Sequence, residues 1–585
     1  MLCGMTETRS VFIQHERVDD VPVIIGIATK LGMADILNRH LGTHGLQQGL
    51  HNGQLAVGWL AYILSQADHR KSAVRDWAGG LSHTLCQLLG QPIRPVDFTD
   101  DRLGALLRRF SDDAAWQAIE QDLWVASVTV YDLSLTGVRV DATTGSGHHE
   151  PHPTGLMQYG HSKDHRPDLT QFKLMAAAAE PTGQLLASDI TAGQCADDPL
   201  YTPLIRRVRT LLGRWGLLYS GDCKMAALAT RADLVGNGDY YLTPLPLTGD
   251  TADDLEGWVN AIVDGEQTAT LIWDGNTLLG AGYEFERPQT ATWQDEQGNA
   301  QPVSWSERVL VTRSLALAQA QQAHLEQRLA RATAALLALT PVPGKGKRQI
   351  REEAVLQQAI QQTLERYRVQ DLLTVEWEQE TTTRTRYRGR GRPGSQRASY
   401  RETQVRYVIR KVQRNEDAVA AQRYRLGWRA QVTNRPPGQL TLSQAVVHYR
   451  GGWVLERDFH LVKDLPLGLT PLFVWKDDQI KGLTRLLTLA LRILTLIETQ
   501  VRQGLGQENK RLTGLYAGQA QRQTARPTGK RILQAFARAQ ITLTGLVVNA
   551  QTEWHITALS ELHEQVLRYL RLPVTLYAAL INNSS

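Results

Sequence analysis

Apolar residues recur every three to four positions through the first part of the chain. This spacing predicts helices over four stretches: residues 21–37, 55–67, 82–89 and 102–110. Pro92 and Pro95 interrupt the pattern. We therefore expect residues 1–130 to form a helical N-terminal domain, for which packing or dimerisation is the simplest role.

The next stretch changes to short apolar or alternating runs, which are typical of strands. Such runs occupy residues 138–141, 172–178, 185–190, 217–219 and 239–243. Helical spacing over 200–212 and 224–234 falls between the last three of them. The predicted order is three strands, a helix, a strand, a helix and a strand.

The chain then continues for a long way before the next helix with candidate chemistry, so residues 246–440 are predicted to be an insertion. Its expected helices cover 312–339 and 352–367, and its expected strands cover 268–273, 373–378, 403–410 and 425–432. The core, residues 131–245, is expected to resume over 441–505, which includes an apolar helix over 483–497. A C-terminal segment, 506–585, contains a helical pattern over 558–570.

The amino-acid composition restricts the possible classes of protein and of metal site. A chain of 585 residues is too long for one compact core. The balance of 64 Lys and Arg against 59 Asp and Glu is only mildly basic and does not by itself indicate nucleic acid. Four cysteines without a CxxC pair argue against a zinc ribbon and fit a reducing cytoplasm. No secretory signal is evident, and the 483–497 run is too short for a membrane span.

Three acidic residues are the main candidates for chemistry. Asp141 and Asp222 each close an apolar run and are expected at the C-terminal ends of strands, whereas Glu456 is expected on a helix. Carboxylates that converge from strand ends and a facing helix form an oxygen-rich site for hard divalent cations such as Mg²⁺. The alternative is that Asp141 is a turn residue and Asp222 a helix cap.

The predicted helix around Glu456 carries further polar residues. Tyr449, Glu456 and Lys463 are spaced by seven, which places them on one helical face. Lys463 is a candidate phosphate ligand. Solvated charges on an ordinary amphipathic helix are the alternative, and Gly451 and Gly452 weaken the first turn.

These residues resemble the signature of DDE transposases of bacterial insertion sequences, in the "IS four" group and its sixteen-thirty-four subgroup. That signature is Tyr, two residues, Arg, three residues, Glu, six residues and Lys. Tyr449, Glu456 and Lys463 are in register, but Gly452 stands at the Arg position, with Arg450 nearby. Residues 159–171 and 100–104 also resemble blocks of the subgroup.

The resemblance implies an α/β fold: an RNase H-like catalytic core interrupted by a large mixed α/β insertion, with a helical N-terminal domain. It also implies that this N-terminal domain, residues 1–130, binds the transposon ends. It implies that Asp141, Asp222 and Glu456 hold two Mg²⁺ ions, with Mn²⁺ as a substitute. The implied activity is to bind the terminal inverted repeats of a mobile element, cleave there and join 3′-hydroxyls to target DNA. The implied partners are double-stranded DNA and a second copy of the chain in the synaptic complex. No membrane is expected, and the location is the bacterial cytoplasm or nucleoid.

Two further groups are candidate DNA ligands. Residues 384–414 hold ten Arg and one Lys against a single acid, and the alternation that includes Arg388, Arg390 and Arg392 predicts a basic ribbon for the minor groove. A solvated loop is the alternative. Lys163 and Arg166 either hold a DNA phosphate or cap the strand that follows.

Three histidines lie close together in the sequence. His148, His149 and His152 are expected in a surface loop, because no second cluster completes a zinc site.

Two rival functions remain open at this point. One is an RNase H-like nuclease without strand transfer, and the other is an inactive DNA-binding remnant.

Overall fold

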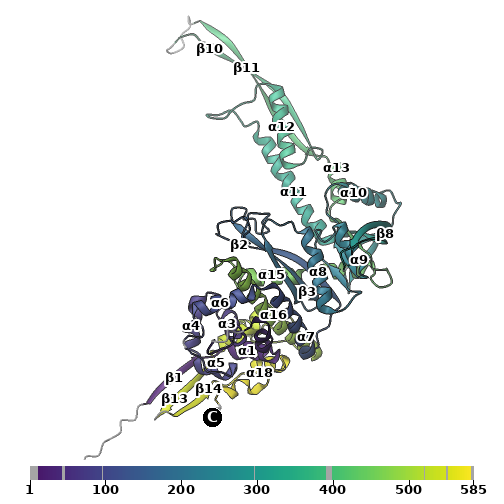
Figure 1. The fold of residues 1–585 in the computed structure, drawn as a ribbon. Helices are drawn as coiled ribbons and strands as arrows, with labels where there is room; N and C mark the ends of the chain where they lie inside the picture. Colours follow the sequence, from purple (N-terminus) through teal and green to yellow (C-terminus); the bar gives the residue numbers. More distant parts are fainter. Residues whose placement is uncertain are drawn as a thin grey trace, which may run out of the picture.

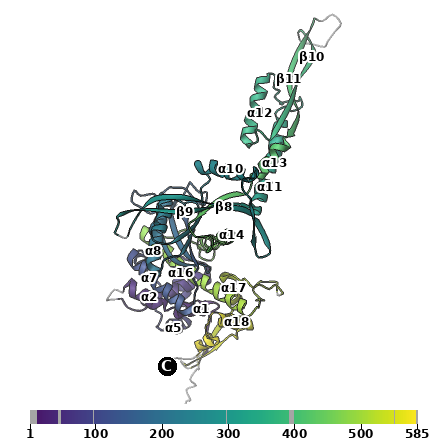
Figure 2. The same cartoon turned by 90° about the vertical axis from the view of Figure 1, so that its right-hand side faces the viewer.

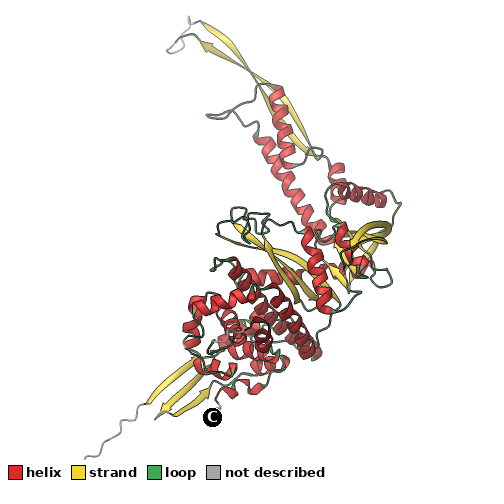
Figure 3. Ribbon diagram, viewed as in Figure 1, coloured by secondary structure: helices red, strands yellow, loops and turns green. Residues whose placement is uncertain are grey.

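A nine-stranded mixed sheet runs through the middle of the protein, with strand order β4-β3-β2-β5-β6-β12-β9-β8-β7 (Figures 1 and 3). The computed structural model describes residues 11–42, 47–94, 96–295, 297–389, 398–519, 521–548 and 551–581. The strands of the sheet are β2 (Gly137–Gly147), β3 (Thr170–Glu180), β4 (Gln184–Ala192), β5 (Leu218–Ser220), β6 (Tyr240–Pro244), β7 (Thr270–Asp274), β8 (Thr277–Gln294), β9 (Ala300–Ser314) and β12 (Trp428–Thr433).

The first five strands form the expected core. β2, β3 and β4 are an antiparallel meander, and β5 and β6 run parallel to β2 and to each other. α8 (Asp198–Leu212) connects β4 to β5, and α9 (Leu228–Gly236) lies between β5 and β6. The predicted order of strands and helices is therefore confirmed, although α9 begins four residues later than expected.

The expected end of the first strand at Asp141 is wrong, because β2 continues to Gly147. β3 pairs with β2 along its whole length, from Gly137 opposite Glu180 to Gly147 opposite Thr170. Antiparallel pairing with a long neighbour carries the strand past the end of its apolar run. Asp141 therefore lies in the middle of a strand.

The region predicted as an insertion extends the core sheet. β12 pairs antiparallel with β6 on one side and with β9 on the other, and β9 pairs with β8 along fifteen residues. Along the outer half of β8, exposed positions alternate with half-buried ones. The apolar periodicity of the sequence did not reveal this hairpin. β9 also takes the first residues of the helix expected from position 312, because α11 starts only at Leu315.

The rest of this region forms an extended arm with its own small core (Figures 1 and 2). Leu325, Leu329 and Leu336 of the first arm helix pack with Leu356 and Ile360 of the second. The arm elements, with the neighbouring α10, are α10 (Asp250–Val263), α11 (Leu315–Ala338), α12 (Glu353–Tyr367), β10 (Leu373–Tyr387), β11 (Ser399–Arg414) and α13 (Glu416–Tyr424).

Helices surround the other end of the sheet. The expected helix over 21–37 is instead two helices, because Gly32 adopts a left-handed φ of 62° between them. The helices of this part are α1 (Val21–Lys30), α2 (Met33–Leu41), α3 (Asn52–Gln66), α4 (Lys71–Gly79), α5 (Ser82–Leu89), α6 (Asp100–Phe110), α7 (Asp113–Tyr131) and α16 (Asp477–Gln507).

α16 forms the centre of this helical body and is buried along most of its length. It approaches α6 so closely that a Cβ added at Gly482 would lie 2.0 Å from the Leu107 carbonyl oxygen. Among the residues that the structure describes, no single helix meets the length and hydropathy of a membrane span. The pair α1 and α2, bent by 64°, meets them together by length and composition alone.

The two ends of the described chain meet in a second, three-stranded sheet. It consists of β1 (Val11–Arg17), β13 (Thr542–Val548) and β14 (Gln551–Ile556), with β13 in the centre. The N-terminal region is therefore not wholly helical. α17 (Gly529–Ala539) and α18 (Glu561–Tyr569) pack on α16, so these two C-terminal helices belong to the helical body.

Asp20, at the start of α1, gives a prediction about stability. Its side chain is buried, and burial raises its pKa from 3.8 to about 7. Between those values the unfolded chain ionises while the folded protein keeps the proton, so stability falls as pH rises from about 4 to about 7.

Asp20→Asn is therefore expected to raise the free energy of unfolding at pH 8, on the order of a few kcal/mol. The gain should shrink towards pH 4, where the parental carboxyl is neutral in both states. Denaturant unfolding at the two pH values measures the difference. An equal effect at both would contradict this account.

Candidate active site

The parallel pairing of β2 and β5 sets the position of the first two acids. Val138 pairs with Tyr219, and Arg139 pairs with Ser220. Continuing this register by two residues brings Asp141 level with Asp222, just beyond the point where β5 ends. Neighbours in register on parallel strands project to the same face. The two carboxylates therefore belong to one edge of the sheet.

Asp141 is electrostatically linked to both other acids. Burial, together with the charges of Asp222 and Glu456, raises its pKa to about 6, against the lowering effect of the Lys163 ammonium. Its Oδ1 accepts a hydrogen bond of 2.7 Å from the Ala142 amide. A carboxylate that is enclosed and flanked by two like charges favours an added cation.

Asp222 is held in place by two donors. The Tyr201 hydroxyl, from α8, and the Lys224 amide donate to its Oδ1 over 2.6 Å and 2.9 Å. The Thr243 hydroxyl donates to its backbone oxygen over 2.7 Å. The bond from Lys224 is the capping contact of the alternative interpretation, but α9 begins only at Leu228. Asp222 therefore stabilises a turn at the site edge.

Glu456 lies in the first turn of α15 (Trp453–Lys463) and is exposed. Leu455, Phe459 and Val462 form a buried apolar stripe on α15, and the helix packs on β2. That packing turns one side of the helix to the sheet. It leaves Glu456 near enough to Asp141 for its charge to raise the pKa of that residue.

The three acids fit a divalent cation in donor type and in charge. Carboxylate oxygens are the ligands that Mg²⁺ prefers, and their mutual repulsion would be relieved by a positive ion. Within the described ranges, however, no three His, Cys, Asp or Glu side chains are grouped closely enough to hold a metal ion. The carboxylates would have to come closer together on binding.

Two lysines connect the loop over residues 161–169 to the site. Lys163 donates to the Ala142 carbonyl over 2.6 Å and lies 3.7 Å from Asp141 Oδ1. Lys463, at the end of α15, forms an ion pair of 2.6 Å with Asp164, which also accepts a bond of 3.4 Å from Thr144. The Lys463 ammonium is therefore already paired with the carboxylate of Asp164 in this loop.

Arg166 points to a different partner. It is exposed and makes a two-pronged contact with Asp168, with distances of 2.8 Å and 2.7 Å. Of the two candidate phosphate ligands in this loop, Lys163 faces the acids, whereas Arg166 is paired within the loop.

The expected continuous helix from Tyr449 to Lys463 is wrong. α14 (Leu442–Arg450) ends before Gly451, and α15 starts at Trp453, because the two glycines lower helix stability there. Tyr449 still lies near the acids. Burial and the charge of Asp222 raise its pKa, to about 12, against the effect of Arg139. The Arg139 guanidinium lies over the Tyr449 ring, 5.9 Å from its centroid.

Gly452, the departure from the transposase signature, lies against an arginine from another element. A Cβ added at Gly452 would be 2.8 Å from Nη1 of Arg139 in β2. Arg139 also donates to the His448 carbonyl over 3.0 Å and pairs with Glu180 at 2.6 Å. The guanidinium of Arg139, a residue of the sheet, therefore occupies the space next to Gly452.

In the described part of the arginine run, three arginines form ion pairs with acids on the opposite strand of the hairpin. Arg386 pairs with Glu402 at 2.7 Å, and Arg406 pairs with Glu380 at 2.6 Å. Arg410 pairs with Glu378 and Glu380. The count of one acid within residues 384–414 leaves out the acids of β10. These acids precede the run in the sequence but lie beside it in the hairpin.

Three arginines of the run were named as DNA ligands. Arg390 and Arg392 lie outside the described residues. Arg388 follows β10, is exposed, and its amide donates to the Ala398 carbonyl over 3.0 Å. A DNA contact by these residues stays a prediction.

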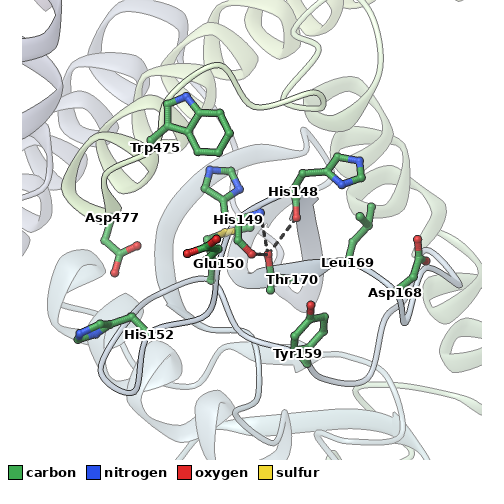
Figure 4. A pocket seen from close by; sticks show the side chains of 13 residues that line it. His148, His149, Glu150, His152, Tyr159, Asp168, Leu169, Thr170, Trp475 and Asp477 are labelled. Atoms are coloured by element: carbon green, nitrogen blue, oxygen red, sulfur yellow. Dashed lines mark hydrogen bonds between the residues drawn. The ribbon is translucent and has the colours of Figure 1, made fainter.

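The histidine-rich loop lines a cavity of about 570 Å³ that sequence reasoning did not anticipate (Figure 4). His149 is hydrogen-bonded to the Val474 carbonyl at 3.0 Å, and its ring lies 5.0 Å from that of Trp475. His148 and His152 are exposed, as expected of a surface loop. Trp475, just before α16, gave no signal of its own in the sequence.

Comparisons with known proteins add one weak likeness. No protein-family model and no curated protein matches the sequence. Among solved structures, the fold is similar to a piggyBac transposase in a synaptic complex with hairpin DNA, determined by cryo-EM. The TM-score is 0.23 and the identity 10%, over 52% of this chain and 63% of that chain. A likeness of this size carries no argument about function.

The contact between Gly452 and Arg139 gives a prediction. Gly452→Ala should displace the Arg139 guanidinium and break its hydrogen bond to the His448 carbonyl, which keeps its bond from the Gly451 amide. Losing a hydrogen bond from a charged donor costs about 1.5–3 kcal/mol of unfolding free energy. Gly451→Ala is the matched control, because its Cβ would meet only the His448 oxygen, at 3.1 Å. Equal melting temperatures for the two variants would show that Arg139 has no fixed place there.

Proposed function

We propose that the protein is a DDE transposase with an RNase H-like core. The observation that carries this proposal is the arrangement of the three acids. Asp141 lies on β2, Asp222 lies just beyond the end of the adjacent parallel strand β5, and Glu456 lies on a helix packed against the same sheet. The order along the chain that the sequence predicts for this core, three strands, a helix, a strand, a helix and a strand, is present. The five strands lie in the sheet in the order β4-β3-β2-β5-β6.

In this proposal Asp141, Asp222 and Glu456 hold two Mg²⁺ ions, for which Mn²⁺ is a substitute. Metal ions held in this way supply the activation of an attacking oxygen and the stabilisation of a leaving oxygen in phosphodiester chemistry. Tyr201 orients Asp222 through its 2.6 Å hydrogen bond. Lys163 keeps a positive charge next to Asp141.

The proposed substrate is double-stranded DNA, first the two ends of a mobile element and then target DNA. Because two ends must be joined, a homodimer is proposed for the synaptic complex. Arg388, which follows β10, is proposed to contact the minor groove, and so are Arg390 and Arg392, which lie outside the described residues. The proposed location is the bacterial cytoplasm, on the nucleoid when DNA is bound.

The rival of an inactive remnant rested on the glycine at the signature Arg position. A guanidinium from Arg139 lies beside that glycine, and the three acids are intact, which supports an active site. A nuclease that cuts without joining has the same acids. An assay that scores both cleaved ends and joined products separates the two activities.

Removing any of the three acids should abolish metal-dependent cleavage. Asp141→Asn, Asp222→Asn and Glu456→Gln each remove a charged ligand with little change of shape. The loss should be about a thousandfold or more, while DNA binding is largely kept. Cleavage and joining of labelled end duplexes in Mg²⁺ measure the effect. Near-parental cleavage by one variant would remove that residue from the site.

Lys463 can be tested against its own partner. If its ammonium binds the cleaved strand's phosphate, Lys463→Ala should slow cleavage of pre-bound DNA, and Asp164→Asn should not, because it frees the ammonium. If Lys463 only fastens the loop to α15, both variants should slow cleavage alike. Single-turnover cleavage at saturating protein measures both rates. Parental rates for Lys463→Ala would remove it from the site.

A further inference from the structure

A basic segment near the C-terminus was not assigned any chemistry by sequence reasoning. Residues 509–540 contain seven Lys and Arg and no Asp or Glu. The members are Lys510, Arg511, Arg522, Arg526, Lys530, Arg531 and Arg538. All except Lys530 are exposed. A one-sided charge of this density on a folded surface calls for a negatively charged partner.

The arginines of this segment lack the carboxylates that neutralise the arginines of the arm. Within the described ranges, no Asp or Glu oxygen lies within 4.0 Å of the side-chain nitrogens of Arg511, Arg522, Arg526 or Arg531. The nearest acid in sequence, Glu508, is taken by Lys510 at 2.7 Å. The charge of this surface is therefore available to an external anion.

The chain gathers these side chains together. Leu512 and Thr524 form an antiparallel bridge, with bonds of 2.9 Å and 3.0 Å, which brings Arg511 close to the residues before Arg526. Guanidinium groups of Arg522 and Arg531 both lie over the ring of Tyr516, at 3.9 Å and 4.6 Å from its centroid. Two like charges on one ring repel each other, and a phosphate between them would relieve the repulsion.

The basic segment is fixed rigidly to the helix that carries Glu456. Glu498 of α16 accepts hydrogen bonds from Arg457 of α15, which is next to Glu456, and from the Gly529 amide at 3.2 Å, at the start of α17. Lys530 donates to the carbonyl of Leu465, just beyond α15, over 3.2 Å. α15 spans about 10 Å from Glu456 to Lys463. Lys530 of the basic segment thus lies next to the residues that follow the Lys463 end of α15.

We propose that Arg511, Arg522, Arg526 and Arg531 form a docking surface for the phosphates of double-stranded DNA. This proposal rests on the proposed transposase function, because it identifies the partner as the same duplex that reaches the acids. Guanidinium forks match phosphate oxygens in geometry. The α15–α16–α17 contacts would hold the docked duplex in a fixed register relative to Glu456.

The test compares two full-length variants that lose the same charge. Arg511→Gln with Arg526→Gln removes two arginines that have no carboxylate partner and do not stack on Tyr516. Arg70→Gln with Arg425→Gln removes two exposed arginines that are already paired, with Asp68 at 3.0 Å and with Glu256 at 2.7 Å. Fluorescence anisotropy with a mixed-sequence duplex measures the affinity at several salt concentrations.

The expected result is a slope of log affinity against log salt that falls by about two units in the first variant, with about tenfold or greater loss of affinity at low salt. The control should keep the parental slope. Equal slopes in both variants, with parental melting temperatures, would overturn the docking surface. Loss of affinity for anionic lipid vesicles without loss for the duplex would also overturn it.

The same measurements separate this inference from the proposed function. If the parental protein binds and cleaves DNA but the first variant keeps the parental slope, only the docking surface fails. If the parental protein neither binds the duplex nor cleaves it in Mg²⁺, both proposals fail.

Discussion

The candidate site depends on a short stretch of parallel pairing between β2 and β5. Only Val138 with Tyr219 and Arg139 with Ser220 are paired, yet this register decides which residues of the two strands lie side by side. It places Asp141 beside the turn that holds Asp222. It also orients Arg139, the neighbour that reaches Tyr449, His448 and the space at Gly452. A slip by one residue would turn Asp141 to the other face of the sheet.

A second constraint is the attachment of α15. Its apolar stripe packs on β2, and Arg457 ties it to Glu498 in α16. Glu498 also accepts the first amide of α17. One buried carboxylate thus links the helix of the third acid, the central helix and the basic segment. We therefore regard the sheet edge, α15 and α17 as one functional unit, with the arm as a separate extension.

Much of this was accessible from the sequence. The order of core elements followed from apolar periodicity, and the acids were found because each adjoins a strand or helix pattern. The true end of β2 was not accessible, because it depends on pairing with β3. The two glycines in the sequence indicated the break between α14 and α15. The position of Arg139 beside them could not be predicted, because Arg139 belongs to β2, far away in the sequence. The ion pairs of the arginine run were not accessible for the same reason, since several of the paired acids lie on the partner strand. The exposed arginines beyond α16 form no continuous run in the sequence, because they are scattered along the chain, and their grouping depends on the fold.

The central claim is that Asp141, Asp222 and Glu456 form one site for divalent cations. Mn²⁺ binding to the protein–DNA complex, counted by electron paramagnetic resonance, tests it most directly because it does not depend on turnover. The account predicts two bound ions per chain in the parental complex, and their loss when all three acids are replaced by their amides. Unchanged Mn²⁺ binding in that triple variant, with DNA still bound, would contradict it.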